Sequence, residues 1–123
     1  MNIALILSGG IGTRVGTDIP KQYIEVAGRP IISYCVEQLA NHESVDAIQI
    51  VAKEEWHDII LKSCSTPAFL EKWKGFSKIG ENRQLSIYHG LEDIKKYACD
   101  NDIVFIHDAA RPLLSYQIIT DCF

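Results

Sequence analysis

The chain has 123 residues, of which 47% are hydrophobic and 23% are charged, and its formal net charge at pH 7 is −4. This length and composition suit one globular domain with a sizeable core, and the negative balance argues against a nucleic-acid partner. No apolar run approaches the roughly 18 residues that a membrane-spanning helix needs, so we expect no membrane partner either.

The first predicted element is a buried strand of a parallel sheet, because residues 4–7 are apolar on both faces. A glycine-rich turn follows this strand and contains three glycines: Gly9, Gly10 and Gly12. Glycine tolerates positive φ and a close approach of the backbone to a ligand. Successive main-chain N–H groups in such a turn form a concave anion site.

Two cations follow the turn and strengthen its interpretation as a phosphate site. Arg14 offers a planar guanidinium to phosphate oxygens, and Lys21, directly after Pro20, offers a compact ammonium. We therefore favour a nucleotide triphosphate site over an ordinary strand turn. The spacing does not fit a Walker loop, which needs a lysine directly after its last glycine. It does not fit the dinucleotide fingerprint either, because the sequence lacks the third glycine that this fingerprint requires.

Strands and helices alternate along the rest of the chain. A short extended piece is predicted at 22–27 and a turn at 28–30. Further strands are predicted at 46–52, 76–79 and 102–106, and helices at 31–40, 54–62, 67–74, 82–98 and from 115 onward. This order predicts an α/β fold, in which a mostly parallel sheet carries helices on both faces.

The helix at 82–98 is the longest predicted element. Asn82 is a suitable N-cap for it. Its apolar residues recur at helical spacing and predict the face turned to the core: Leu85, Tyr88, Leu91, Ile94 and Ala98. We assign Trp56, Trp73, Tyr88 and Tyr97 to the core, and His42, His57 and His89 to the surface or to helix faces.

Three polar-rich segments follow predicted strands: 8–14, 80–86 and 107–112. In parallel α/β sheets, ligands bind outside the carboxyl ends of the strands, so these segments predict one shared site. In the second segment, Gly80 ends a strand and a helix N-terminus with free N–H donors begins. Arg83 and Ser86 can face a ligand from the first turn of that helix; the alternative is simple capping beside a solvated arginine.

The third segment places a carboxylate, Asp108, at the end of a strand. A single carboxylate suits Mg²⁺, which commonly takes waters and substrate phosphates as its remaining ligands. The alternative role for Asp108 is an ion pair with Arg111. We expect His107 to be a hydrogen-bonded structural residue rather than a base.

The cysteines and the two ends of the sequence bear on its context. Cys35, Cys64, Cys99 and Cys122 form no C-x-x-C pair, which favours free thiols in a reducing compartment over zinc or disulfides. No signal peptide is visible, so we expect a cytoplasmic protein. The sequence stops within an apolar helical pattern at 118–123, from which we expect the N-terminal part of a longer domain.

Four segments together resemble the cytidylyltransferases that act on 2-C-methyl-D-erythritol 4-phosphate or ribitol 5-phosphate. They are Leu-Ser-Gly-Gly-Ile-Gly-Thr-Arg at 7–14, Pro-Lys-Gln at 20–22, Gly-Glu-Asn-Arg-Gln-Leu-Ser at 80–86 and His-Asp-Ala-Ala-Arg-Pro at 107–112. The resemblance implies a Rossmann-like nucleotidyltransferase fold and a place in isoprenoid or ribitol phosphate metabolism. It also implies a reaction in which CTP and a polyol phosphate give a CDP-polyol and pyrophosphate, with Mg²⁺.

The same resemblance implies roles for individual residues. Arg14 and Lys21 would stabilise the pentacoordinate α-phosphate and the departing pyrophosphate. Asp108 would bind magnesium, and Arg111 would lie toward the polyol phosphate. The nucleotide would be held by Ser8, Gly9, Gly10, Gly12, Gly80, Glu81, Arg83 and Ser86.

Two features qualify the resemblance. Ser8-Gly9 replaces the Ala-Ala that is common in the methylerythritol-type enzymes and is closer to the ribitol type. The family's second half, with its further metal-binding residue, second lysine and dimerisation arm, is absent, and a homodimer is expected at full length. Two other functions therefore stay open: a fragment that binds CTP without turnover, and a nucleotidyltransferase for another sugar phosphate.

Overall fold

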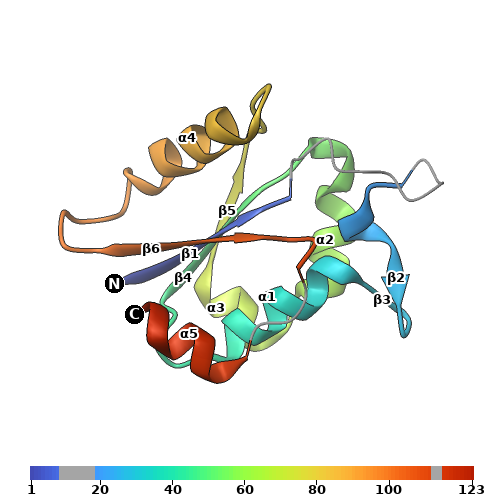
Figure 1. Cartoon of the computed structure of the whole chain (residues 1–123), viewed down its shortest axis with the longest axis horizontal. Coiled ribbons are helices and arrows are strands. Elements are labelled where there is room, and N and C mark those ends of the chain that lie inside the picture. Colours follow the sequence, from blue (N-terminus) through green and yellow to red (C-terminus); the bar gives the residue numbers. More distant parts are fainter. Residues whose placement is uncertain (9–18, 112–114) are drawn as a thin grey trace.

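The computed structural model describes residues 1–8, 19–111 and 115–123. In this part of the chain, one sheet contains four parallel strands in the spatial order β5-β4-β1-β6 (Figure 1). These strands are β1 (Asn2–Leu7), β4 (Ala47–Val51), β5 (Trp73–Ser77) and β6 (Ile103–Asp108). The predicted α/β class with a parallel sheet is confirmed.

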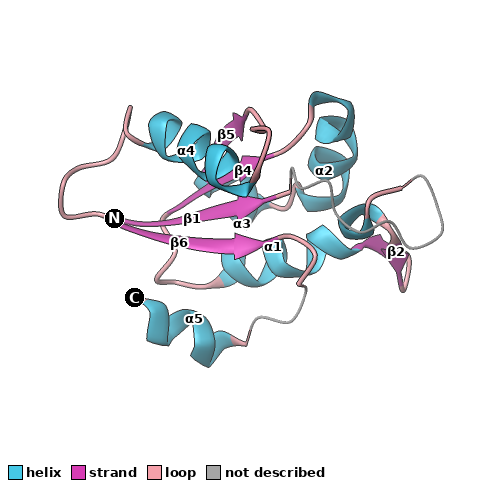
Figure 2. Cartoon of the chain, turned by 45° about the horizontal axis from the view of Figure 1, so that its top comes forward, coloured by secondary structure: helices cyan, strands magenta, loops and turns pink. Residues whose placement is uncertain are grey.

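Helices cover both faces of this sheet, as predicted. The described α-helices are α1 (Ile31–Asn41), α2 (His57–Cys64), α3 (Pro67–Lys72), α4 (Arg83–Ile94) and α5 (Tyr116–Cys122). Helix α4 lies on one face, and α1, α3 and α5 lie on the other (Figures 1 and 2). In the described residues, no helix has the length and apolar character needed to cross a membrane.

Strand β1 is the centre of the core because helices pack on both of its faces. Its alternating residues divide between the two sides: Ala4 and Ile6 belong to the cluster beneath α1, and Ile3 and Leu5 to the cluster beneath α4. All four are fully buried. Each such leucine or isoleucine stabilises the fold by roughly 1.5–3 kcal/mol, which explains the continuous apolar run in the sequence.

The segment between β1 and α1 differs from its prediction. Instead of one extended piece, it forms a short 3-10 helix η1 (Lys21–Tyr23) and an antiparallel hairpin of β2 (Glu25–Val26) and β3 (Arg29–Pro30). The hairpin turns at Ala27 and Gly28, whose φ angles are 54° and 82°. Two consecutive positive φ angles suit a two-residue hairpin turn, which the extended prediction did not include.

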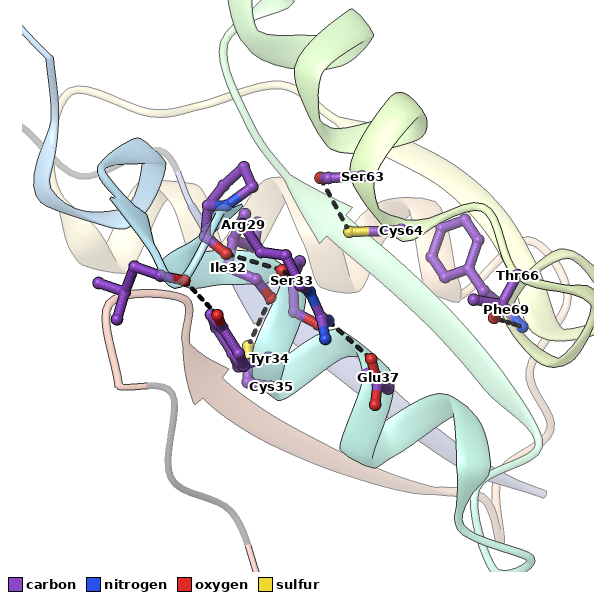
Figure 3. Close-up of polar contacts among 12 residues, drawn as sticks. Arg29, Ile32, Ser33, Tyr34, Cys35, Glu37, Ser63, Cys64, Thr66 and Phe69 are labelled. Atoms are coloured by element: carbon purple, nitrogen blue, oxygen red, sulfur yellow. Dashed lines mark hydrogen bonds and ion pairs between the residues drawn. The ribbon is translucent and has the colours of Figure 1, made fainter.

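The hairpin is fastened to the first turns of α1. The Tyr34 hydroxyl donates to the carbonyl of Val26, and Arg29 forms an ion pair with Glu37 at 2.7 Å (Figure 3). The Ser33 hydroxyl donates to the carbonyl of Pro30 at 2.8 Å.

All four cysteines are free thiols, and Cys35 and Cys64 are buried.

Strand β5 begins earlier than predicted, because Trp73 and Lys74 belong to it and not to the preceding helix. A second 3-10 helix, η2 (Glu54–Trp56), precedes α2. The pairing of β5 with β4 is irregular: the register shifts between Ile48 and Gln49, and Gly75 has a φ of 129°. Glycine tolerates this backbone conformation, which other residues rarely adopt.

Helix α4 has its predicted N-cap but turns a different face to the sheet. The Asn82 side chain accepts a hydrogen bond from the Leu85 N–H at 2.9 Å. The prediction of the inner face was wrong for Leu85, Tyr88 and Leu91, which are exposed. The residues buried within α4 are Ser86, Gly90 and Ile94.

Small side chains explain this orientation of α4. A Cβ atom on Gly90 would lie 2.7 Å from Leu5 Cδ1 and 3.1 Å from Val51 Cγ2. The helix backbone therefore approaches the sheet more closely than a larger residue would allow. A pattern based on large apolar residues identifies the wrong stripe when glycine and serine make the contact.

One histidine also differs from its assignment. His42 is buried, and its ring stacks on Tyr116 with a centroid distance of 4.4 Å. His42 Nδ1 accepts from the Ser44 N–H at 3.0 Å, so Nε2 carries the proton and donates to Thr120 Oγ1 at 2.8 Å. His42 thus connects the end of α1 to α5 as a core residue.

Candidate nucleotide-binding site

The three polar-rich segments predicted to share one site begin at strand ends on the same edge of the sheet. Strands β1 and β6 are neighbours, with Leu7 opposite Asp108. The Ala109 N–H donates to the Leu7 carbonyl at 2.9 Å, which carries the pairing past the strand ends. Arg83, in the first turn of α4, reaches Asp108 Oδ1 at 3.3 Å. The predicted convergence of these three segments is confirmed for their described residues.

The chain order reverses at this edge. From β1 the chain moves outward to β4 and then to β5, and it returns through α4 to place β6 on the opposite side of β1. In open α/β sheets, ligands bind beyond the carboxyl ends of the two strands on either side of such a reversal, which here are β1 and β6. Ser8 and Asp108 lie on the two sides of that position.

Ser8 is only 2% exposed, and all its polar groups have partners within the protein. Its N–H donates to the Val51 carbonyl at 2.8 Å. Its carbonyl accepts from Gln22 Nε2 at 2.8 Å, and its hydroxyl lies 2.5 Å from the Tyr23 hydroxyl. These bonds bring η1 back to the end of β1, so the exposed Lys21, which precedes Gln22, lies close to the end of that strand.

Tyr23 also stabilises the contact between η1 and the end of β1. Its ring stacks on Trp56 with a centroid distance of 4.4 Å. Burial raises the pKa of Tyr23 to about 12, so its hydroxyl keeps its proton at neutral pH. Sequence reasoning used Pro-Lys-Gln only for its lysine and missed that the following Gln22 and Tyr23 anchor it.

Gly80 is packed against the first turn of α4. A Cβ atom on Gly80 would lie 2.3 Å from Leu85 Cβ and 2.7 Å from the Ser86 nitrogen. Its N–H donates to Ser86 Oγ at 2.9 Å. Only glycine fits this position, and the resulting compact loop leaves Glu81 and Arg83 exposed next to the N-terminus of α4. A helix N-terminus attracts anions through its free N–H groups and its dipole.

Asp108 forms its described ion pair with Arg83 and not with Arg111, so the predicted alternative partner was wrong. The Arg83 side chain is 57% exposed and the Asp108 side chain 37% exposed. The backbone of Arg111 closes the turn after β6, because its N–H donates to the Asp108 carbonyl at 3.1 Å. Its carbonyl lies 2.7 Å from His107 Nε2, which gives His107 the expected structural hydrogen bond.

The remaining predicted site residues lie outside the described part of the chain. These are Gly9, Gly10, Gly12 and Arg14. Within the described ranges, no group of three or more metal-ligating side chains is present. A lone, partly exposed carboxylate such as Asp108 nevertheless fits Mg²⁺, since nucleotide phosphates and water can supply the other ligands.

A separate cavity of about 450 Å³ opens at the carboxyl ends of β4 and β5. Its lining includes Lys53, His57, Phe76 and Lys78. The ring of His57 stacks on that of Phe76 with a centroid distance of 3.7 Å. This cavity lies at the ends of β4 and β5 and not at the reversal of strand order between β1 and β6, so it does not define the predicted nucleotide site.

The fold defines a class of protein: a doubly wound α/β protein, a class in which ligands bind at the switch point of the sheet. The comparison with known families is more specific. Residues 2–123 match the model of the family IspD, 2-C-methyl-D-erythritol 4-phosphate cytidylyltransferase, and the chain belongs to this family.

Relatives within the family carry two names. The chain is 38% identical over 120 residues to a ribitol-5-phosphate cytidylyltransferase of Streptococcus agalactiae, a match covering 97% of this chain and 50% of the relative. It is 33% identical over 123 residues to a 2-C-methyl-D-erythritol 4-phosphate cytidylyltransferase of Lachnospira eligens, a match covering 100% of this chain and 52% of the relative. The chain thus spans about half the length of the curated relatives it matches.

Solved structures agree on the fold. A crystal structure of 2-C-methyl-D-erythritol 4-phosphate cytidylyltransferase from Francisella tularensis superimposes with a TM-score of 0.73 at 29% identity, over 98% of this chain and 49% of that one. A structure of 4-diphosphocytidyl-2C-methyl-D-erythritol synthase gives a TM-score of 0.75 at 22% identity, over 97% of this chain and 50% of that one. The predicted family and fold are confirmed.

Proposed function

We propose that this protein transfers CMP from CTP to a polyol phosphate, either ribitol 5-phosphate or 2-C-methyl-D-erythritol 4-phosphate, and releases pyrophosphate. The observation that supports this most directly is the meeting of Ser8, the Gly80–Ser86 loop and Asp108 at one edge of the sheet. These are the described parts of the segments that resemble the family.

The reaction needs positioning and positive charge more than acid–base chemistry. An oxygen of the polyol phosphate forms a bond to the α-phosphorus of CTP, and the bond from that phosphorus to the oxygen bridging to the β-phosphate breaks. The electron pair leaves with pyrophosphate. The attacking phosphate is already an anion, so no general base is required. This suits a site with lysine, arginine and backbone donors.

We assign the roles as follows. Lys21 and Arg14 neutralise charge on the α-phosphate and on the departing pyrophosphate. The backbone around Gly80 and the N-terminal turn of α4 hold the nucleotide, with Glu81 and Ser86 on its cytidine side. Asp108 would hold Mg²⁺, which supplies further positive charge to the phosphates when bound. Arg111 lies toward the polyol phosphate.

The proposal is tested by measuring pyrophosphate release by the full-length protein with Mg²⁺, CTP and each polyol phosphate in turn. We expect release with CTP and at least one of the two acceptors, and little with UTP. Binding of CTP without turnover of either acceptor would instead support a nucleotide-binding role. Failure to bind CTP would reject the proposal.

A further inference from the structure

Gln49 is an unusual residue for its position. It lies in the middle of β4 and is 3% exposed, while the other four residues of this strand are fully buried and apolar. A buried amide is costly unless its donor and acceptor are both satisfied. Gln49 meets this condition: Nε2 donates to Ser77 Oγ at 2.9 Å, and Oε1 accepts from the Tyr97 hydroxyl at 3.2 Å.

The two partners of Gln49 lie on either side of the Gly80 loop in the sequence. Ser77 is the last residue of β5, three positions before Gly80, and Tyr97 follows the end of α4. The Ser77 carbonyl also accepts from the Ala52 N–H at 3.2 Å. The bonds of Gln49 therefore fix both flanks of the segment that carries the loop and helix α4.

The backbone pairing of β4 with β5 is irregular at Gln49, so the side-chain hydrogen bonds of Gln49 contribute more to the position of β5. The pairing of β4 with β5 shifts register between Ile48 and Gln49, and Gly75 opposite Gln49 has a positive φ. The ladder of backbone hydrogen bonds is irregular at this point and defines the position of β5 less strictly. The hydrogen bond from Gln49 to Ser77 restrains the end of β5, after the irregular position and just before the chain continues to Gly80.

The Tyr97 hydroxyl is the donor of the hydrogen bond to Gln49 and keeps its proton at neutral pH. Burial raises its pKa to about 12, so the hydroxyl remains protonated at neutral pH. The Lys74 ammonium also lies 5.4 Å from the centre of the Tyr97 ring, which connects the segment after α4 to β5.

We propose that Gln49 is a positioning residue for nucleotide binding: through Ser77 and Tyr97 it sets the position of the Gly80–Ser86 loop relative to the ends of β1 and β6. The inference rests on the proposed function, because it assigns the nucleotide to that loop. Gln49 lies within the sheet and acts through the loop and not by contact with the ligand. Misplacement of binding groups by a fraction of an ångström is enough to weaken a site.

The test compares three variants of the full-length protein: Gln49→Leu, Ser77→Ala and Tyr97→Phe. CTP affinity is measured by calorimetry, and KM and kcat are measured with the better acceptor. Each lost hydrogen bond should weaken CTP binding by about threefold to tenfold, and Gln49→Leu should weaken it most. We expect KM for CTP to rise while kcat changes less than twofold.

Ser33→Ala is the matched control. Ser33 is also a buried serine with a hydrogen-bonded hydroxyl, which donates to the Pro30 carbonyl and accepts from Arg29 Nε at 3.1 Å, but it lies in α1 and away from the loop. Ser33→Ala should lower the melting temperature at least as much as Ser77→Ala, while only Ser77→Ala weakens CTP binding. Equal effects of both variants on CTP affinity would show a general loss of stability and overturn the inference.

Hydrogen exchange provides a readout that does not depend on CTP. In the nucleotide-free protein, Gln49→Leu should speed amide exchange in the Gly80–Ser86 loop but not in α1. Unchanged loop exchange, or unchanged CTP affinity in a folded Gln49→Leu protein, would overturn the inference and leave the proposed function intact. If wild type binds no CTP, the proposed function fails, and exchange alone decides whether Gln49 positions the loop. If Gln49→Leu does not fold, Tyr97→Phe decides in its place.

Discussion

At the scale of single residues, the candidate site depends on a few positions that the fold holds tightly. Ser8 is immobilised by Gln22, Tyr23 and Val51, and this anchors the segment that carries Lys21. The side chains that we propose to face the ligands, such as Arg83 and Lys21, are exposed. In the proposed site, buried residues therefore set the geometry and exposed residues meet the substrates.

Lys21→Ala should reduce turnover at saturating CTP by at least about a hundredfold, because it removes a positive charge from the transferring phosphates. The melting temperature should stay within a degree or so of wild type, because Lys21 is exposed. Lys62→Ala, an exposed lysine on α2, is the control and should leave turnover unchanged. Near-normal turnover of Lys21→Ala would contradict the assigned role.

Gly80→Ala should damage both stability and nucleotide binding. Its new methyl group would lie 2.3 Å from Leu85 Cβ and 2.6 Å from the Leu85 carbonyl carbon, so the loop or the first turn of α4 must move. We expect a loss of about 1–3 kcal/mol in the free energy of unfolding, measured by urea denaturation, together with weaker CTP binding. Glu92→Ala on exposed α4 surface serves as the control. A Gly80→Ala protein with normal stability and affinity would disprove the role of this close contact.

At the scale of elements, mutations of two helix N-caps distinguish an effect on stability from an effect on nucleotide binding. Asn82 caps α4 by accepting from Leu85 N–H, and Thr66 caps α3 by accepting from Phe69 N–H at 3.2 Å. Asn82→Ala and Thr66→Ala should each cost about 1 kcal/mol in thermal or urea unfolding. Only Asn82→Ala should also weaken CTP binding, because its cap lies in the predicted nucleotide loop. Equal CTP affinities of the two variants would argue against that location of the nucleotide.

Elements were predictable from sequence where large apolar residues decide the packing. The run at 4–7, the cap at Asn82 and the beginning of the last helix near Ser115 follow from local chemistry, and the structure confirms them. The inner face of α4 was not predictable from apolar spacing, because Gly90 and Ser86 make its closest contacts with the rest of the fold. His42 looks like a surface residue until α5, 78 positions away, supplies its partner Thr120.

The candidate site shows the same limit. Strand ends and their order predicted where the loops meet, because parallel strands share one carboxyl edge. The pairing of Asp108 with Arg83 and not with its sequence neighbour Arg111 depends on where α4 begins relative to β6. That relation is tertiary and has no local signal. The contacts of Ser8 with Gln22 and Tyr23 likewise depend on the path of the chain between them.

At the scale of the whole molecule, several buried groups make the fold sensitive to alkaline pH. Burial raises the pKa of Tyr23 and of Cys35 to about 12 and that of Cys64 to about 11. The unfolded chain releases these protons nearer pH 9 for the thiols and pH 10 for the hydroxyl. The folded state therefore binds more protons above about pH 9, so stability falls as pH rises from there toward about 12.

Thermal unfolding followed by circular dichroism checks this prediction. The melting temperature should vary little from about pH 7 to 8.5 and then fall progressively. Cys64→Ala should make the fall shallower, while Cys99→Ala, which removes an exposed thiol, should leave its slope unchanged. A melting temperature that stays constant to about pH 11 would contradict the prediction.

The contact between Arg83 and Asp108 has a consequence for how the two ligands of the proposed reaction influence each other. A nucleotide that draws the guanidinium away leaves the carboxylate uncompensated, and a cation that takes the carboxylate frees the guanidinium for phosphate. Whichever binds first bears the cost of separation, so each raises the affinity for the other by the same factor. Because the contact is solvent-exposed, its rupture contributes at most about 1 kcal/mol, or roughly fivefold, to this cooperativity.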